Sequence, residues 1–159
     1  MKLMELKDCA ACDLIRFRTN DEKTEWAIVG KKNPDIFPIV VVTGAEAPFI
    51  VTAVLHGHTI DNFESHPVLN YGNKFELSPD HLGECQIGDS RLFSTKGSFV
   101  LANNDRYLVV GRHKQSSTHY FDLSTGEVRS QPGGMLASFK DWTLRISGIG
   151  PDTSSMKLV

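Results

Sequence analysis

The chain has few cysteines, no long apolar run and no large excess of charge of either sign. Three cysteines, an odd number, do not form a disulfide framework, so we expect a reducing, cytoplasmic location. No segment approaches the ~20 apolar residues of a membrane helix, and the first residues lack an apolar stretch of signal-peptide length, so we expect no membrane association. A formal net charge of -2 argues against binding of nucleic acid through a broad basic face, so we do not expect a nucleic-acid partner.

The length of 159 residues suits one domain. A domain of this size buries roughly 68–70% of the surface of its unfolded chain, and it therefore needs no disulfide or metal ion to fold. Hydrophobic residues make up 40% of the chain and charged residues 23%, as in ordinary globular proteins. We expect a single β-rich domain over residues 1–151, followed by a flexible C-terminal tail over residues 152–159.

Helical periodicity is scarce. It is limited to Leu3–Cys12, where apolar residues recur at helical spacing, and to a turn or two near Met135–Phe139. Alternation of apolar and polar residues dominates instead. Asp13–Thr19 and Trp26–Val29 alternate on either side of the polar turn Asn20–Lys23, which predicts a hairpin.

Further strands are predicted along the rest of the chain. Phe49–Leu55 is apolar on both faces, as in a strand covered on both sides. The other predicted strands are Ile36–Thr43, Ser98–Ala102, Tyr107–Gly111, His119–Leu123 and Trp142–Ile146. Polar turns, the first of them Asn103–Arg106, join the middle three of these into a predicted β-meander. These patterns predict a mainly β protein, an antiparallel β-sandwich or a small β-barrel, with at most one or two short helices.

Half of the six histidines lie between His56 and His66, directly after the apolar run. If the strand continues through His58, then His56 and His58 share one face, and Glu64 or His66 can supply a third ligand. Two imidazoles and a carboxylate with open positions suit Fe(II), Mn(II) or Zn(II). The alternative is a polar loop that holds no metal ion.

The same residues carry a resemblance to a known family. His56-Gly57-His58, followed by Glu64 and Gly72, resembles the first motif of the cupins, with slightly longer gaps. The resemblance implies a β-barrel that holds a single divalent ion (Fe, Mn, Ni or Zn) on His56, His58 and Glu64, completed by His66 or His81. Such a protein would act on a small molecule through its metal ion.

A second group of metal-ligating residue types is spread along the chain. Cys9 and Cys12 have zinc-knuckle spacing, and His81 and Cys85 are possible partners for a closed Cys₃His site. A redox pair is another interpretation of Cys9 and Cys12. The simplest alternative is that both cysteines pack as small apolar side chains.

The remaining functional candidates are surface groups. Arg112 and His113 begin a polar, basic loop between two strands, and Tyr71 lies in a less regular region. With no firm catalytic constellation, the favoured hypothesis is a non-enzymatic binding domain with another protein as its partner and no cofactor. Partner recognition and an inhibitor-like or immunity-like accessory role are both compatible with it. The alternative is the cupin-like metal-dependent protein.

The two hypotheses differ in their metal content. The cupin-like alternative predicts a stoichiometric ion after loading with Fe, Mn, Ni or Zn, which His56→Ala abolishes and Cys9→Ala leaves in place. Elemental analysis of the purified variants measures this. A substoichiometric metal content, with an unchanged melting temperature after loading, would rule out the metal-dependent alternative.

Overall fold

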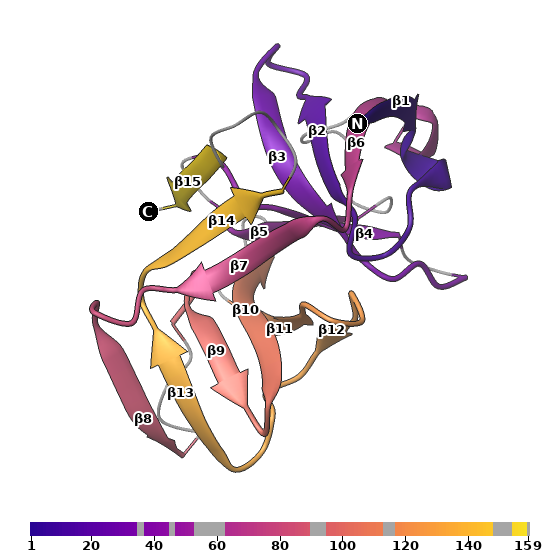
Figure 1. Cartoon of the computed structure of the whole chain (residues 1–159). Helices are drawn as coiled ribbons and strands as arrows, with labels where there is room; N and C mark the ends of the chain where they lie inside the picture. Colours follow the sequence, from indigo (N-terminus) through magenta and orange to yellow (C-terminus); the bar gives the residue numbers. More distant parts are fainter. Residues whose placement is uncertain are drawn as a thin grey trace.

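In the structure, a computed structural model, nearly all of the regular secondary structure described is β-strand (Figure 1). The structure describes residues 1–34, 37–44, 47–52, 63–89, 95–112, 117–147 and 154–158. The strands in these ranges are β1 (Lys2–Glu5), β2 (Leu14–Arg18), β3 (Thr24–Val29), β4 (Pro38–Val41), β5 (Phe49–Thr52), β6 (Pro67–Gly72), β7 (Phe75–Pro79), β8 (Cys85–Asp89), β9 (Phe99–Ala102), β10 (Asp105–Arg112), β11 (Thr118–Asp122), β12 (Val128–Arg129), β13 (Met135–Phe139), β14 (Trp142–Ile146) and β15 (Ser154–Leu158).

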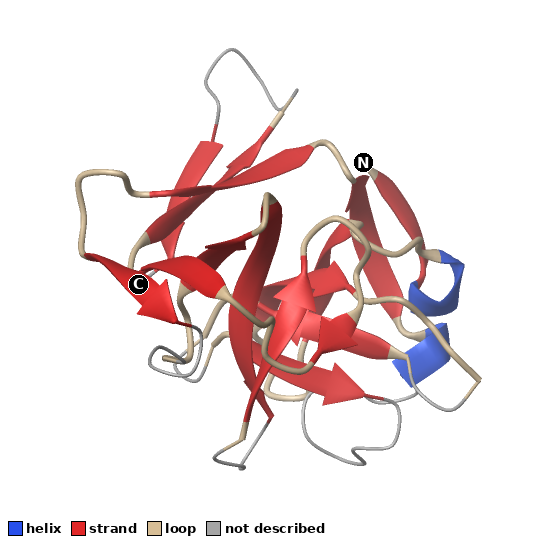
Figure 2. Cartoon of the chain, turned by 90° about the horizontal axis from the view of Figure 1, so that it is seen from below, coloured by secondary structure: helices blue, strands red, loops and turns tan. Residues whose placement is uncertain are grey.

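Helix is confined, among the described residues, to two short 3-10 turns. They are η1 (Leu6–Asp8) and η2 (Phe63–Ser65), which contact each other near the N-terminus (Figure 2). Neither turn has the length to cross a membrane. The prediction of a mainly β protein with at most one or two short helices is confirmed for this part of the chain.

The described strands form a 12-stranded and a 3-stranded sheet. The larger sheet has the order β1-β6-β2-β3-β4-β5-β10-β9-β13-β8, with β11 and β12 branching from β10. The smaller sheet has the order β15-β14-β7. The long strand β10 joins the two halves of the larger sheet, because its first residues pair with β9 and its last two with β5. The β5–β10 pairing is parallel, whereas the neighbouring pairs are antiparallel.

The chain passes from one sheet to the other between β7 and β8, and again between β13 and β14. β7 and β14 pair with each other in the smaller sheet, and β8 and β13 pair with each other in the larger sheet. The corner between them holds backbone hydrogen bonds from Asp80 to Asp141 (2.9 Å) and from Lys140 to Glu84 (3.1 Å). The connection over residues 80–84, between β7 and β8, turns the chain at this corner. β8 and β13 therefore extend beyond the end of the smaller sheet (Figure 1).

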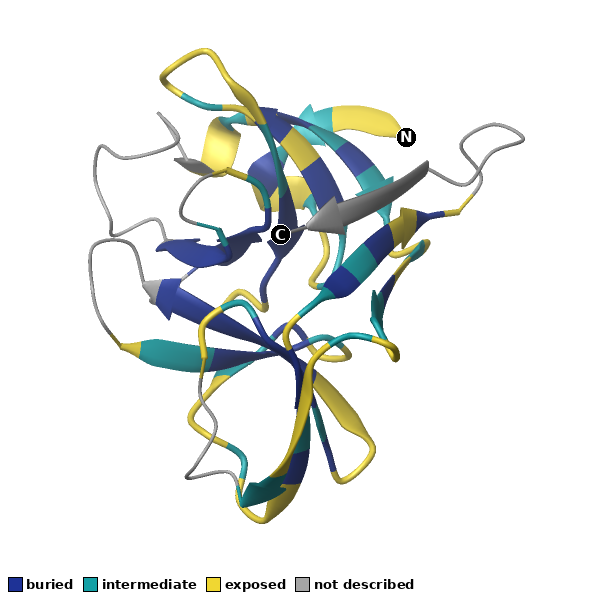
Figure 3. Cartoon of the chain, turned by 90° about the vertical axis from the view of Figure 1, so that its left-hand side faces the viewer, coloured by how far each residue is buried: buried dark blue, intermediate teal, exposed yellow. Residues whose placement is uncertain are grey.

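The central strands β4 and β5 of the larger sheet are buried on both faces. In β4 and β5, Val40 and Ile50 enter the first core cluster, whereas Ile39 and Val51 enter the second on the opposite face. The smaller sheet covers the first cluster with Leu77, Trp142, Leu144 and Ile146. Alternate side chains of a strand point to opposite faces, so β-branched residues fill both layers. Figure 3 shows this buried center between the more exposed ends.

The tight turn between β9 and β10 follows the predicted meander. Asn103 and Asn104 both adopt positive φ, at 49° and 70°, which defines a two-residue hairpin turn of the primed type. Asparagine tolerates this backbone region better than most residues. The strand-turn-strand prediction over this segment is confirmed, as is the hairpin of β2 and β3.

Three local expectations differ from the structure. Leu3–Cys12, expected as a helix, contains the end of β1 and the single turn η1, whose N-cap residue Glu5 makes no side-chain capping bond. Met135–Phe139, expected as a turn or two of helix, is β13, because pairing with both β8 and β9 outweighs the helix propensity of Met, Leu and Ala. In the expected tail, residues 154–158 form β15 and pair with β14.

The contact between the two sheets generates a stability prediction. Leu144 is fully buried where the smaller sheet covers the first core cluster. Leu144→Ala should lower the free energy of unfolding by about 2–5 kcal/mol, because it removes buried methyl groups and leaves a cavity. Urea unfolding followed by tryptophan fluorescence and by circular dichroism measures this.

Leu82→Ala is the control, since Leu82 is 99% exposed and its loss should change stability by less than about 0.5 kcal/mol. A single coincident transition is expected for both optical signals, as for one cooperative domain. Two separate transitions, with Leu144→Ala shifting only one of them, would contradict a shared core.

Candidate binding sites

An apolar surface lies where the larger sheet extends past the smaller one. Leu101 of β9, Ala137 of β13 and Ile87 of β8 are direct cross-strand partners, so their side chains share one face. Met135 and Cys85 lie on the same face by alternation along β13 and β8. We call these five residues the β8 surface. Ile87 is 73% exposed and Met135 is 63% exposed.

The β8 surface continues outward from the hydrophobic core. Phe139 is buried in the first core cluster, and Ala137 and Leu101 pack partly against that cluster. The ring of His81, in the corner before β8, makes an edge-on contact with Phe139 at 5.9 Å between centroids. Strand β8 forms the end of the sheet: in the described chain it pairs with β13 alone. The lower end of Figure 3, where Figure 1 places β8 and β13, shows exposed ribbon.

The charged residues of β8 and of the corner before it are acidic. The segment Asp80–Asp89 carries three carboxylates and no lysine or arginine. Asp80 accepts a hydrogen bond from the backbone N–H of Leu82 at 3.0 Å, which stabilises the corner. Glu84 forms an exposed ion pair with Lys140 at 3.4 Å. A basic segment of a partner would therefore be attracted to this edge of the sheet.

A cavity of about 430 Å³ lies between β7 and β10. It is lined in part by Phe75 and Leu77 of β7, and by Arg106 of β10. Arg106 is the direct cross-strand partner of Leu101. The cavity therefore lies three strands inward from the β8 edge, about 14 Å away, and is too distant for a segment paired with β8.

A second, larger cavity of about 530 Å³ lies between the β3–β4 connection and the β11–β12 hairpin. Pro38, Ile50 and Val128 supply its apolar lining, and Lys31, Lys32, Arg129 and Glu127 supply its charged lining. His119 of β11 also lines it. Three cations and one carboxylate surround this space, which we call the cationic pocket.

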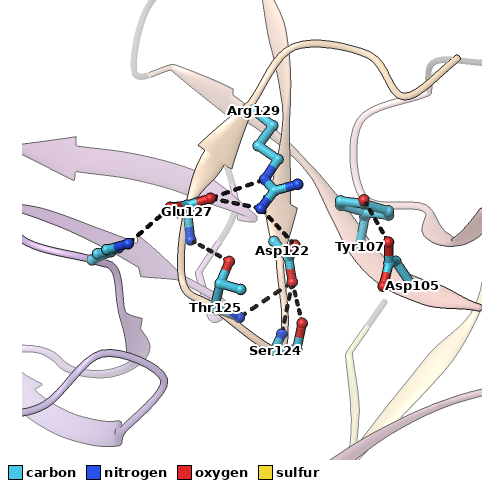
Figure 4. A network of polar contacts seen from close by, with 8 residues as sticks. Asp105, Tyr107, Asp122, Ser124, Thr125, Glu127 and Arg129 are labelled. Carbon is cyan, nitrogen blue, oxygen red and sulfur yellow. Dashed lines mark hydrogen bonds and ion pairs between the residues drawn. The ribbon is translucent and has the colours of Figure 1, made fainter.

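Glu127 holds two of these cations in place (Figure 4). Its Oε1 accepts a hydrogen bond from Nζ of Lys31 at 2.9 Å, and its Oε2 accepts bonds from Nη2 and Nε of Arg129 at 2.6 and 3.1 Å. The hydrogen bond from Lys31, followed by that from Arg129, lowers the pKa of Glu127 below its ordinary value. The same pairing with Glu127 raises the pKa of Arg129.

Asp122 anchors the hairpin that carries these residues. This buried carboxylate accepts hydrogen bonds from the backbone N–H and hydroxyl of Ser124, at 2.9 and 2.6 Å, and from the N–H of Thr125 at 3.2 Å (Figure 4). Burial acts to raise the pKa of Asp122, but these hydrogen bonds and the charge of Arg129 outweigh it and lower the pKa. A hydrogen bond from the N–H of Lys31 to the carbonyl of Gly126 (2.8 Å) then joins the hairpin to the end of β3.

The predicted histidine-cluster site falls only partly within the described residues. His56 and His58 lie outside them. Glu64, in η2, is half-exposed and forms an ion pair with Lys32 at 3.7 Å. Nε2 of His66 lies 3.0 Å from the backbone carbonyl oxygen of Arg18. The metal site on His56, His58, Glu64 and His66 stays a prediction.

The predicted cysteine site is not assembled in the structure. Within the described ranges, no group of three or more His, Cys, Asp or Glu side chains is arranged to hold a metal ion, so Cys9, Cys12, His81 and Cys85 do not come together as ligands. All three cysteines are free thiols. Burial raises the pKa of Cys9 to about 11 and also raises that of Cys12, which disfavours the thiolate that metal ions require.

The predicted surface candidates have different surroundings. Arg112 ends β10 and pairs through its backbone with Ile50, and its side chain is outside the described part of the structure. His113 is also outside it. Tyr71 of β6 packs against Trp26 at 4.8 Å between ring centroids, and the guanidinium of Arg16 lies 5.5 Å from the Trp26 ring. Tyr71 is therefore part of a packed aromatic contact.

Neither the β8 surface nor the cationic pocket was predicted from the sequence. The alternation of Cys85, Ile87 and Asp89 is only a weak indication of a strand. The exposure of that strand depends on where the smaller sheet ends, which the sequence does not indicate. The paired basic residues Lys31 and Lys32 are visible in the sequence, whereas their proximity to Arg129 depends on the fold. Comparison with known proteins found no matching family model, no matching curated protein and no matching solved structure.

The hydrogen bonds of Asp122 generate a pH prediction. Asp122→Asn should lower the free energy of unfolding by about 1–2 kcal/mol at neutral pH, because charge-assisted hydrogen bonds are stronger than neutral ones. The folded pKa lies below the ordinary value of 3.8, so this stabilisation is present above that value and is lost as the pH falls through the folded pKa.

Urea unfolding of both proteins at neutral pH and at about pH 3 tests this linkage. The stability difference should become smaller at the lower pH. An Asp122→Asn variant that is as stable as the wild type at neutral pH, or a difference that does not shrink on acidification, would contradict the assigned role.

Proposed function

We propose that this protein is a non-enzymatic binding domain that recognises an extended segment of another protein along strand β8. The observation that carries the proposal is an apolar row across β9, β13 and β8 that continues from the core to an exposed sheet edge. The partner segment would add a strand to this edge, with main-chain hydrogen bonds for affinity and alternate side chains for specificity.

The exposed edge supports this proposal. Proteins commonly protect edge strands with charged side chains, proline or bulges, because an open edge pairs with other chains. β8 instead presents the exposed Cys85, Gln86 and Ile87 in succession. Large exposed apolar side chains next to one another are a feature of interaction sites.

The acidic flanks favour a different protein over a second copy of this chain. Pairing of β8 with its own counterpart in an antiparallel dimer would bring Glu84 and Asp89 of one copy toward the same carboxylates of the other. Such like-charge contacts across an interface are unfavourable. We therefore propose a partner segment with apolar residues at alternate positions and with lysine or arginine between them.

The β8 surface generates a binding prediction. Ile87→Lys should weaken partner binding at least tenfold, or ~1.4 kcal/mol, because it places a charge in the center of the apolar row. Affinity capture from the source organism with the wild-type protein, followed by calorimetric titration of the purified partner and its minimal segment, measures this.

Leu3→Lys is the matched control. Leu3 is 74% exposed and lies on β1, the opposite edge strand of the same sheet, so the change is chemically equivalent at a distant place. Equal loss of binding in both variants, or no loss in Ile87→Lys, would overturn the proposal. Light scattering distinguishes the second-copy outcome, since a dimer that Ile87→Lys dissociates would identify this chain as its own partner.

A further inference from the structure

We propose that the cationic pocket is a separate binding site for a small ligand with an apolar body and one anionic group, such as a carboxylate or sulfonate. The site does not involve the β8 surface and does not depend on the proposed protein partner. Its cavity of about 530 Å³ lies within the usual size of small-molecule pockets, which is roughly 300–1,000 Å³.

The apolar part of the pocket is an opening into the first core cluster. Ile50 belongs to that cluster and Val128 packs against it, and both residues line the cavity. Pro38, which is buried, completes this lining at the start of β4. Apolar side chains that face a cavity favour the transfer of an apolar ligand body from water.

The charged part of the lining favours an anion. Lys31, Lys32 and Arg129 contribute three positive charges, and Glu127 contributes one negative charge. Two further carboxylates lie just outside the lining: Asp122 is 3.6 Å from Arg129, and Glu64 is 3.7 Å from Lys32. The anionic group of a ligand would therefore bind by direct contact with the cations of the lining, in place of the weaker of these ion pairs.

Glu127 gives the pocket a defined geometry. Because its two oxygens bind Lys31 and Arg129, both cations are held at the rim before a ligand arrives. Cations held in position in advance lose less conformational entropy on binding than mobile ones.

Of the three cations that line the pocket, Lys32 forms the longest ion pair. Its Nζ lies 3.7 Å from Glu64, and both side chains are about half-exposed. Exposed ion pairs of this kind contribute little, so Lys32 can exchange Glu64 for a ligand anion. Its Nζ also lies 5.2 Å from the ring of Phe37, which keeps the charge near the cavity.

Anilinonaphthalene sulfonate, which joins an aromatic body to one sulfonate, is a suitable probe. Fluorescence titration should show saturable binding to the folded wild-type protein. The double variant Lys31→Gln/Arg129→Gln should weaken binding at least about tenfold, because it removes two charge-assisted contacts. The control Lys23→Gln/Arg145→Gln makes the same change in net charge on other parts of the surface and should bind as the wild type does.

A second variant tests the pocket without removing the contacts that hold the β11–β12 hairpin. Lys32→Gln leaves the contacts of Glu127 intact and should weaken binding by a factor of about three or more. Thermal unfolding followed by circular dichroism verifies that each variant is folded. The neutral analogue phenylnaphthylamine, which has no sulfonate, should bind the wild type at least about tenfold more weakly.

Three results would overturn the proposal. They are the absence of saturable binding to the wild type, unchanged binding in both Lys31→Gln/Arg129→Gln and Lys32→Gln, and equal affinity for the neutral analogue. Ile87→Lys separates the two proposed sites. If that variant abolishes probe binding while the pocket variants do not, the probe occupies the β8 surface, and the pocket proposal fails without affecting the protein-binding one.

Discussion

The packing of the smaller sheet onto one face of the larger sheet organises the rest of this structure. Leu144 and Trp142 from the smaller sheet meet Leu108 and Phe121 from the larger one in a single core cluster. The Trp142 indole N–H also donates a hydrogen bond to the carbonyl of Gly97 at 2.7 Å, which ties the smaller sheet to the connection before β9. Burial of this apolar area is the main driving force available to a fold with so little helix.

Both candidate binding sites lie where this packing ends. The β8 surface is the part of the larger sheet that extends beyond the smaller one, so Ile87 occupies a core-facing position that nothing covers in the described residues. The cationic pocket is another opening, at Ile50 and Val128, between the β11–β12 hairpin and the chain after β3. The same core layer thus supplies apolar contacts to two separate surfaces of the molecule.

The polar network of the β11–β12 hairpin connects stability with recognition. The carboxylate of Asp122 accepts hydrogen bonds from Ser124 and Thr125 inside the hairpin. The carboxylate of Glu127 instead contacts the cations of the pocket. Arg129 contacts both carboxylates, at 2.6 Å to Glu127 and 3.6 Å to Asp122. The buried carboxylate therefore maintains the turn, and the turn positions the charged groups that line the pocket.

The strand content of this protein follows from local patterns. Alternation over β2, β3 and β14, the two-sided apolar character of β5 and the turn at Asn103 and Asn104 each reflect a property of consecutive residues, so they could be predicted. The identity of β13 could not, because its neighbours β8 and β9 are distant in sequence and their pairing overrides helix propensity. Whether Ile87 is exposed and whether Lys31 meets Arg129 likewise depend on which strands lie side by side, and only the tertiary structure decides that.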